Sequence, residues 1–147
     1  MSNALNNDAD KRPSVLLVED DASVRRSLQL LLRSRDIDVR AYASAPPALA
    51  DDHASPACLV ADLVLPEVDG IALLREMRAR GWAGPAILMS GHLTPESSAR
   101  AQETGFDVIL RKPLADSLLL DTVLSLIARA DKADHATPQH RQEHVSP

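Results

Sequence analysis

Several polar side chains in this sequence stand at the ends of short apolar runs, where they could act together in chemistry. Glu19 and Asp20 follow one such run, and Asp62 ends another. Ser90 and Lys112 close two later runs. Two carboxylates about 4 Å apart repel each other by about 1 kcal/mol in water and by about 4 kcal/mol at an effective dielectric constant of about 20. Three carboxylates at one place therefore need a shared proton or a bound cation, and such hard oxygen ligands suit Mg²⁺.

The other two side chains suit a phosphoryl group. Lys112 would bring a positive charge, and Ser90 a neutral hydrogen-bond donor. An aspartate such as Asp62 can act as a nucleophile and form an aspartyl phosphate. Such a site mainly positions groups and neutralises charge, which is most of what phosphoryl transfer requires. The residues thus favour a site that suits Mg²⁺ and phosphoryl oxygens, against the plain alternative that Asp62 only caps a turn or a helix.

These side chains converge only if the apolar runs form neighbouring parallel strands. The runs predict five strands, at Ser14–Val18, Ile37–Tyr42, Cys58–Ala61, Pro85–Ser90 and Phe106–Leu110. Helical spacing and capping signals predict helices between Val24 and Leu32, Ala45 and Asp52, Ile71 and Gly81, Thr94 and Thr104, and Leu119 and Ile127. This alternation indicates a parallel sheet with helices on both faces, and such strands all end at one edge of the sheet.

The length of 147 residues suggests a single domain, which we place at residues 14–130. Residues 1–13 and 131–147 are polar and aperiodic, so we expect a disordered N-terminal arm and a disordered C-terminal tail. His135, His140 and His144 in this tail are interpreted as solvated, since no cysteine or predicted element accompanies them. Because only residues 131–147 follow the predicted domain, we expect no helix-turn-helix or other output domain.

Composition argues against several classes of function. The net charge of −5 and the aromatic content of 2% disfavour binding to nucleic acid or to an anionic membrane surface. No apolar run reaches the ~20 residues that span a bilayer, and the start of the chain lacks the apolar core of a signal peptide. The single cysteine, Cys58, permits no internal disulfide and is interpreted as a small core residue. We therefore expect a cytoplasmic protein without direct nucleic-acid or membrane partners.

Four motifs, taken in order and at this spacing, resemble the receiver domains of two-component response regulators. They are Val18-Glu19-Asp20-Asp21, Asp62-Leu63-Val64-Leu65-Pro66 with Asp69-Gly70, Met89-Ser90-Gly91, and Lys112-Pro113. The resemblance covers about residues 14–130. It implies a flavodoxin-like, doubly wound α/β fold, with five helices around a parallel five-stranded sheet of order 2-1-3-4-5. The stretches 62–70 and 90–92 are most similar to nodulation and nitrogen-fixation regulators.

The resemblance also implies a role for each acidic residue. Asp62 would accept a phosphoryl group from the phosphohistidine of a sensor histidine kinase. Glu19 and Asp20 would hold Mg²⁺ together with Asp62, Glu19 through a water molecule. The backbone carbonyl of Val64 would be a further metal ligand. On this resemblance the protein is a phosphoryl acceptor and not an enzyme with independent substrate turnover.

The same resemblance implies roles around the phosphate. Lys112 would pair with the phosphate, aimed by a cis Lys112–Pro113 peptide bond, and Ser90 would turn inward to hydrogen-bond it. Val64 and His92 occupy the two positions that tune the lifetime of the phosphate in the family. For His92 the plain interpretation is an ordinary surface histidine.

The sequence departs from the family at the switch position. Ile109 stands where the family has an aromatic residue on the fifth strand, and Phe106 lies three residues earlier and does not replace it. The expected output is a changed surface of the fourth helix, fifth strand and fifth helix, or a phosphorelay. Its reader would be a downstream protein, a histidine phosphotransfer protein, or a second copy of the chain. Surplus leucines on the fifth helix also indicate a partner surface; they are Leu118, Leu120 and Leu124.

Three alternatives to a stand-alone phospho-receiver follow from the same residues. Ile109 allows a receiver-like interaction module that works without phosphorylation. An aspartyl-phosphate-type phosphatase usually needs a second acid two residues after the nucleophile, where Val64 stands here. A flavin-binding domain would need a phosphate-cradling loop after the first strand, and the sequence offers none.

Overall fold

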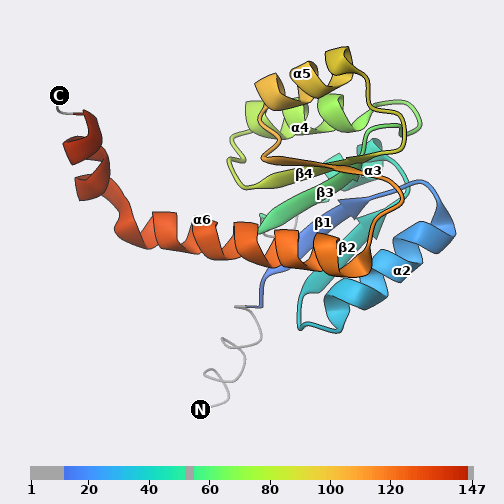
Figure 1. The fold of residues 1–147 in the computed structure, drawn as a ribbon, viewed down its shortest axis with the longest axis horizontal. Helices are drawn as coiled ribbons and strands as arrows, with labels where there is room; N and C mark the ends of the chain where they lie inside the picture. Colours follow the sequence, from blue (N-terminus) through green and yellow to red (C-terminus); the bar gives the residue numbers. More distant parts are fainter. Residues whose placement is uncertain (1–11, 52–54, 146–147) are drawn as a thin grey trace.

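A computed structural model of the chain describes residues 12–51 and 55–145 (Figure 1). Its centre is a five-stranded parallel sheet in the order β2-β1-β3-β4-β5. The strands are β1 (Ser14–Val18), β2 (Asp38–Tyr42), β3 (Cys58–Asp62), β4 (Ala86–Ser90) and β5 (Val108–Arg111). The strand order and direction confirm the predicted flavodoxin-like sheet.

Five helices in the described part of the chain cover the two faces of this sheet. They are α2 (Ala22–Arg33), α3 (Ala45–Leu49), α4 (Gly70–Ala79), α5 (Pro95–Thr104) and α6 (Asp116–Val145). The helices α3, α4 and α5 pack on one face, and α2 and α6 pack on the other (Figure 1). Along β1, Val15 and Leu17 point to the α2/α6 side, while Leu16 and Val18 point to the opposite side, as the two-residue period of a strand requires.

Aspartate and threonine caps begin three of the helices that follow strands, namely α2, α4 and α5. Asp21 accepts hydrogen bonds from the backbone amides of Ser23 and Val24 at the start of α2. Asp69 accepts one from Ala72 at 2.8 Å, at the start of α4. Thr94 and Ser97 form a reciprocal capping box at the start of α5. These caps satisfy amides that a helix leaves unpaired. They also fix where the loops before α2, α4 and α5 end.

The expectation of a disordered tail at residues 131–147 is wrong for the described part of that range. The backbone of α6 continues as helix to Val145, and Figure 1 shows it extending away from the sheet with a bend towards its end. Seven of the fifteen residues from 131 to 145 are Ala, Lys, Gln, Arg or Glu, which are strong helix formers, and extension of an existing helix avoids the cost of nucleation. Pro138 lies within the stretch, and a proline inside a helix bends it without necessarily ending it. Residues 146–147 lie outside the described residues.

Two other predicted segments fall partly outside the described residues. Of the predicted N-terminal arm, residues 1–11 are not described, and Arg12 and Pro13 are. The Pro13 carbonyl accepts the backbone N–H of Asp38 at 2.9 Å. The second helix ends at Leu49, earlier than the predicted Asp52, which is itself outside the described residues. None of the helices in the described ranges has the length and apolar composition needed to cross a membrane.

The packing of α6 predicts opposite outcomes for two neighbouring leucines. Leu119 is fully buried in the core, so Leu119→Ala should lower the free energy of unfolding by about 2–5 kcal/mol. Leu118 is 48% exposed, and Leu118→Ala should change the unfolding free energy by no more than about 0.5 kcal/mol. Urea unfolding followed by circular dichroism measures both values. Equal losses in the two variants would contradict this placement of α6.

Candidate functional site

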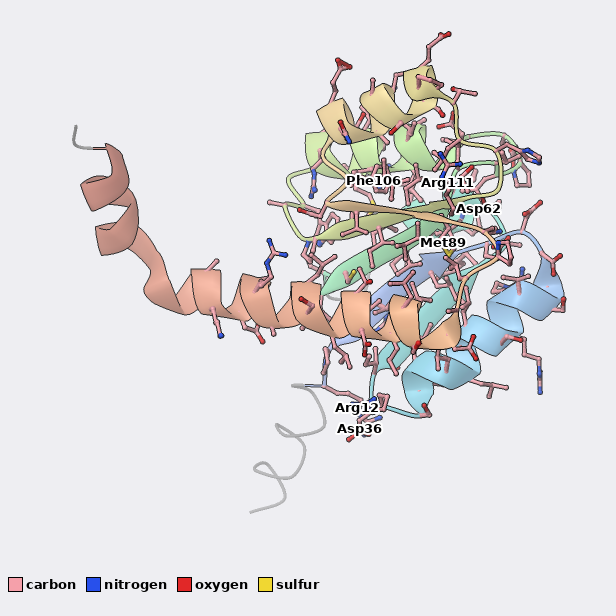
Figure 2. All side chains as sticks on the ribbon, viewed as in Figure 1. Arg12, Asp36, Asp62, Met89, Phe106 and Arg111 are labelled. Carbon is pink, nitrogen blue, oxygen red and sulfur yellow. The ribbon has the colours of Figure 1, made fainter. Side chains whose placement is uncertain are left out.

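Three carboxylates meet at the carboxyl ends of β1 and β3. Carboxylate oxygens of Glu19, Asp20 and Asp62 all lie within 4.8 Å of one another. They converge because β1 and β3 are neighbours, with Val18 paired to Ala61. Glu19 is completely buried and Asp62 is 7% exposed, whereas Asp20 is exposed, so the cluster opens to solvent on one side. Figure 2 shows Asp62 at the same end of the sheet as Arg111, the last residue of β5.

A lysine from the far side of the sheet joins this cluster. Lys112 follows β5, and its backbone amide donates to the Ser90 carbonyl at 2.9 Å. Its Nζ lies 2.6 Å from Glu19 Oε1 and 2.6 Å from Asp62 Oδ2, with both carboxylates accepting hydrogen bonds. The Lys112–Pro113 peptide bond is cis, as the resemblance implied. The ammonium group therefore bridges two buried acids that are 43 residues apart in sequence, by subtraction of their numbers.

Backbone amides hold the remaining oxygen of each bridged acid. Glu19 Oε2 accepts from the amide of Asp21 at 3.1 Å, and Asp62 Oδ1 accepts from the amide of Val64 at 3.2 Å. Arg25 adds a further link, because its Nη1 donates to the Glu19 carbonyl at 2.8 Å. Each acid is thus oriented by the lysine on one oxygen and by its own loop on the other.

The electrostatic balance of the site depends on burial and on Lys112. Burial raises the pKa of Glu19 above its usual range, and the negative charge of Asp62 adds to the rise, although hydrogen bonds from Lys112 and from the Asp21 amide oppose it. Burial alone would lower the pKa of Lys112, but its hydrogen bonds to Asp62 and Glu19 outweigh burial, and the net pKa is raised. The lysine is therefore a fixed cation at neutral pH.

The residues present fit a magnesium ion. Mg²⁺ favours oxygen ligands, is usually held by one or two carboxylates, and keeps several waters and a phosphate oxygen as its other ligands. The cluster offers carboxylate oxygens close together, of which those on Glu19 and Asp62 are buried and oriented. Asp20, on the exposed side, leaves the cluster accessible to a hydrated ion and a phosphate.

Ser90 lies at the end of β4, next to the strand that carries Asp62. It is 1% exposed, and its Oγ accepts a hydrogen bond from the backbone amide of His92 at 3.0 Å. A serine hydroxyl that accepts one hydrogen bond still has its own hydrogen to donate. Ser90 therefore lies at the carboxyl edge of the sheet, near Asp62, and its hydroxyl hydrogen can still be donated.

The other predicted positions surround the site less closely. Val64 is 61% exposed on the loop after β3, and the side chain of His92 is also exposed. Ile109 is half-buried and packs against the core beneath α4 and α5. The structure thus places an aliphatic side chain, half-buried, at the position where the family has its switch aromatic.

The sequence reasoning missed the role of Gly70. A Cβ atom at this position would lie 2.3 Å from the backbone oxygen of Asp62, closer than atoms can approach. The Gly70 amide also donates to the Leu63 carbonyl at 3.0 Å. In the sequence Gly70 was noted only as part of a family motif, although a glycine soon after a candidate nucleophile is also a signal of close backbone approach.

The family is shown by comparison with known proteins. Residues 15–124 match the model of the response regulator receiver domain, which is most of the chain. The chain therefore belongs to the receiver domain family of response regulators, the signalling proteins of two-component systems. Phosphorylation and Mg²⁺ binding are typical of this family, and its members interact with histidine kinases and downstream targets.

Curated relatives include several response regulators. The chain is 36% identical over 116 residues to the transcriptional regulatory protein TdiR of Thauera aromatica, covering 78% of this chain and 51% of that protein. It is 33% identical over 125 residues to FixJ of Bradyrhizobium diazoefficiens, covering 81% and 58%. It is 35% identical over 130 residues to nodulation protein W of the same organism, covering 88% and 57%. The chain spans between about half and three fifths of the length of these relatives.

Solved structures agree on the fold. The receiver domain of the Francisella response regulator 1452 has 26% identity and a TM-score of 0.75, covering 81% of this chain and 99% of that one. A CheY-like receiver domain protein from Methanospirillum hungatei has a TM-score of 0.79, covering 83% and 98%. Its identity of 23% supports the fold alone.

The contact between Gly70 and Asp62 predicts a strong effect for the smallest substitution. Gly70→Ala must displace the Asp62 backbone, so we expect the unfolding free energy to fall by about 1–3 kcal/mol. Gly91→Ala is the matched control, because the nearest atom to its Cβ would be Lys112 Cβ at 3.9 Å, an ordinary contact. Urea denaturation of both variants measures the difference. A Gly70→Ala variant as stable as the wild type would refute the close approach.

The raised pKa of Lys112 predicts a specific dependence on pH. Its stabilising contribution should be fully present below the ordinary lysine pKa of 10.5 and be lost as pH rises through the higher folded value. Lys112→Met should lower the unfolding free energy at pH 8 by about 1–3 kcal/mol, because two buried carboxylates lose their cation. The gap between wild type and variant should narrow above pH 10.5.

Lys132→Met is the control for this experiment, since Lys132 is exposed on α6. Its unfolding free energy should follow that of the wild type across the same pH range. Denaturant titrations at several pH values measure both variants. A constant gap between Lys112→Met and the wild type up to strongly alkaline pH would show that the ammonium does not stabilise the site.

Proposed function

We propose that this protein accepts a phosphoryl group from the phosphohistidine of a sensor histidine kinase onto Asp62. The observation that carries the proposal is the contact of Lys112 Nζ with Asp62 at 2.6 Å, beside a carboxylate cluster that fits Mg²⁺. The ammonium group of Lys112 is already next to the Asp62 carboxylate, to which the negatively charged phosphoryl group would be transferred. Membership of the receiver family supports the same function.

The proposed transfer uses the residues of the site as follows. A carboxylate oxygen of Asp62 forms a bond to phosphorus while the phosphorus–nitrogen bond of the phosphohistidine breaks, and the nitrogen keeps that electron pair. Lys112 pairs with a phosphoryl oxygen, and Ser90 donates its free hydroxyl hydrogen to another. Magnesium held by Glu19, Asp20, Asp62 and the Val64 carbonyl would neutralise phosphoryl charge. The loop amide of Val64 keeps the Asp62 side chain in position.

The proposed output is a changed surface formed by α5, β5 and α6. A phosphate adds about two negative charges and accepts one to three strong hydrogen bonds, so it can draw Ser90 and the start of the β4–α5 loop inward. Ile109 supplies no aromatic switch, which leaves this loop as the moving part. The reader of the surface would be a downstream protein, a histidine phosphotransfer protein, or a second copy of the chain.

Three further expectations stay predictions. We expect the receiver to act in the cytoplasm. We expect no independent substrate turnover, because Val64 stands where a phosphatase of this chemistry would need a second acid. We also expect Val64 and His92 to influence how long the phosphate survives.

The central prediction is a metal-dependent phosphoryl adduct on Asp62. Incubated with acetyl phosphate and Mg²⁺, the wild type should gain one phosphoryl group, detected by intact-mass spectrometry and by a phosphate-retarding gel. Asp62→Asn should reduce the adduct to background, because the nucleophilic oxygen is lost, and chelation of Mg²⁺ should do the same. Asp36→Asn is the matched control, because Asp36 is exposed in the turn after α2 and its substitution should leave the adduct unchanged.

Two outcomes would contradict this function. An adduct that persists in Asp62→Asn would place the phosphate elsewhere. Absence of any adduct, together with partner binding that ignores Asp62→Asn, would favour a receiver-like interaction module. Size-exclusion chromatography with and without beryllofluoride then tests whether the occupied site changes self-association.

A further inference from the structure

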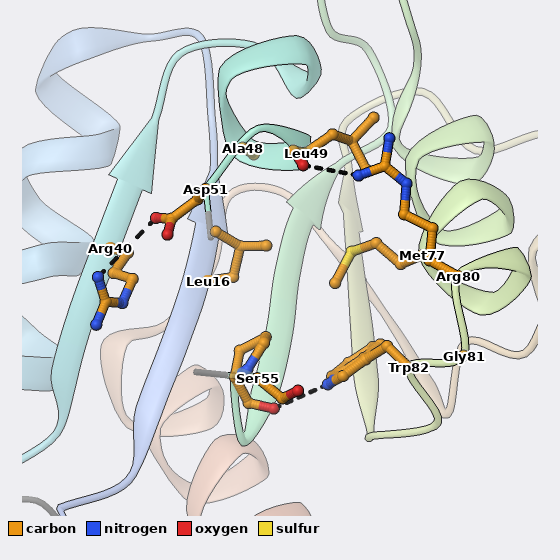
Figure 3. A pocket seen from close by; sticks show the side chains of 11 residues that line it. Leu16, Arg40, Ala48, Leu49, Asp51, Ser55, Met77, Arg80, Gly81 and Trp82 are labelled. Carbon is orange, nitrogen blue, oxygen red and sulfur yellow. Dashed lines mark hydrogen bonds and ion pairs between the residues drawn. The ribbon is translucent and has the colours of Figure 1, made fainter. Parts of the chain in front are cut away.

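A second concave site lies at the opposite edge of the sheet from the acids. It is a cavity of about 300 Å³ between α3 and α4. Pro56, which precedes β3, and Trp82, which precedes β4, both line it, so it lies at the amino ends of strands whose carboxyl ends form the phosphoacceptor site. Figure 3 shows Arg40 and Asp51 on one side of this cavity and Met77 and Trp82 on the other.

Much of the cavity wall is apolar. Leu16 and Ala48 are buried core residues that contribute to it, and Met77 is 8% exposed. The indole Nε1 of Trp82 donates to the Pro56 carbonyl at 2.9 Å, so the ring is held in place and its polar atom is satisfied. A ligand here would therefore need an apolar body, and the volume is at the small end of the range of about 300–1,000 Å³ for small-molecule sites.

One polar group in the cavity is under-used. Arg40 has a buried Nε for which no described residue accepts a hydrogen bond. Its Nη1 lies 4.0 Å from Asp51 Oδ2, which is beyond hydrogen-bond distance, and this oxygen also accepts from the Tyr42 hydroxyl. The Arg40 side chain is 30% exposed, so part of it can be reached from outside. Arg40 thus forms a long ion pair with Asp51 and keeps an Nε–H without an acceptor among the described residues, and a carboxylate matches the planar fork of a guanidinium.

The charged residues around the cavity favour a ligand that carries a single negative charge. Among the described residues that line the cavity, Arg40 and Arg80 are cations and Asp51 is an acid. Arg80 is already engaged, since its Nη1 donates to the Leu49 carbonyl at 2.8 Å and its Nε to Glu76 at 3.0 Å. Arg40 is thus the arginine with an N–H group available for a ligand. A ligand with two negative charges would be repelled more strongly by Asp51 and would find no second available arginine.

We propose that this cavity binds a small monocarboxylate with an apolar body, whose carboxylate pairs with the guanidinium of Arg40. The apolar part of the ligand covers Leu16, Met77 and Trp82. The site shares no residue with the acid cluster, so binding is independent of phosphorylation at Asp62.

Trp82 is the single tryptophan of the chain and reports directly on the cavity. Benzoate is titrated into the full-length protein while the indole N–H resonance of Trp82 is followed by NMR. We expect a saturable shift with a dissociation constant of about 1 mM or lower, in line with the efficiency of small ligands. Benzyl alcohol, of similar size and without charge, should bind at least about tenfold more weakly, which is a difference of 1.4 kcal/mol.

Four variants make the test specific. Arg40→Gln should weaken benzoate binding at least about tenfold, whereas Arg26→Gln, at an exposed position on α2, should leave it unchanged. Ala48→Met should fill the cavity and abolish the shift, which supports the site even if Arg40→Gln unfolds the protein. Asp62→Asn should bind benzoate as the wild type does, so the result is separate from the phosphoacceptor function.

Three results would overturn the proposal. They are the absence of a saturable shift with benzoate, equal affinities for benzoate and benzyl alcohol, and unchanged benzoate affinity in a folded Arg40→Gln variant.

Discussion

The ammonium group of Lys112, held between two buried carboxylates, is the interaction on which the functional end of this molecule depends. Glu19 and Asp62 are acids removed from water, and each would be costly to bury without a cation. The lysine can reach them only because β5 lies on the far side of β4 and ends level with β3 and β1. The order and register of the strands are therefore what allow Lys112 to balance the charge of the two buried acids.

The loops around the acids are built to hold them still. Backbone amides of Asp21 and Val64 orient the two bridged carboxylates, and the side chains of Asp21 and Asp69 start the helices that follow. Gly70 allows the start of α4 to lie against the Asp62 backbone. Acids in these loops thus serve two purposes, because some form the carboxylate cluster and others fix where the helices begin.

The two edges of the sheet differ in character. The carboxyl edge gathers acids around one lysine, while the amino edge has a partly apolar cavity with an arginine whose buried Nε has no acceptor among the described residues. Strand β2 reaches both edges. Tyr42 at its end donates its hydroxyl to Asp51, and its carbonyl accepts the amide of Glu19 at 3.0 Å. The half-buried Ile109 on β5 packs against the core on the side of α3, α4 and α5.

The sequence by itself determined the order of the elements and the candidate acids. Apolar runs of four to six residues alternate with helical spacing, and parallel strands must end at a common edge, so Glu19, Asp20 and Asp62 could be grouped before any distance was known. Local signals were not enough where they conflicted, as in α6, where Pro138 opposes strong helix formers. Only the tertiary structure decided which atoms touch: Lys112 on both acids, Gly70 against Asp62, and Arg40 beside the cavity. Those contacts join residues distant in sequence or depend on close backbone packing, and no local pattern encodes such distances.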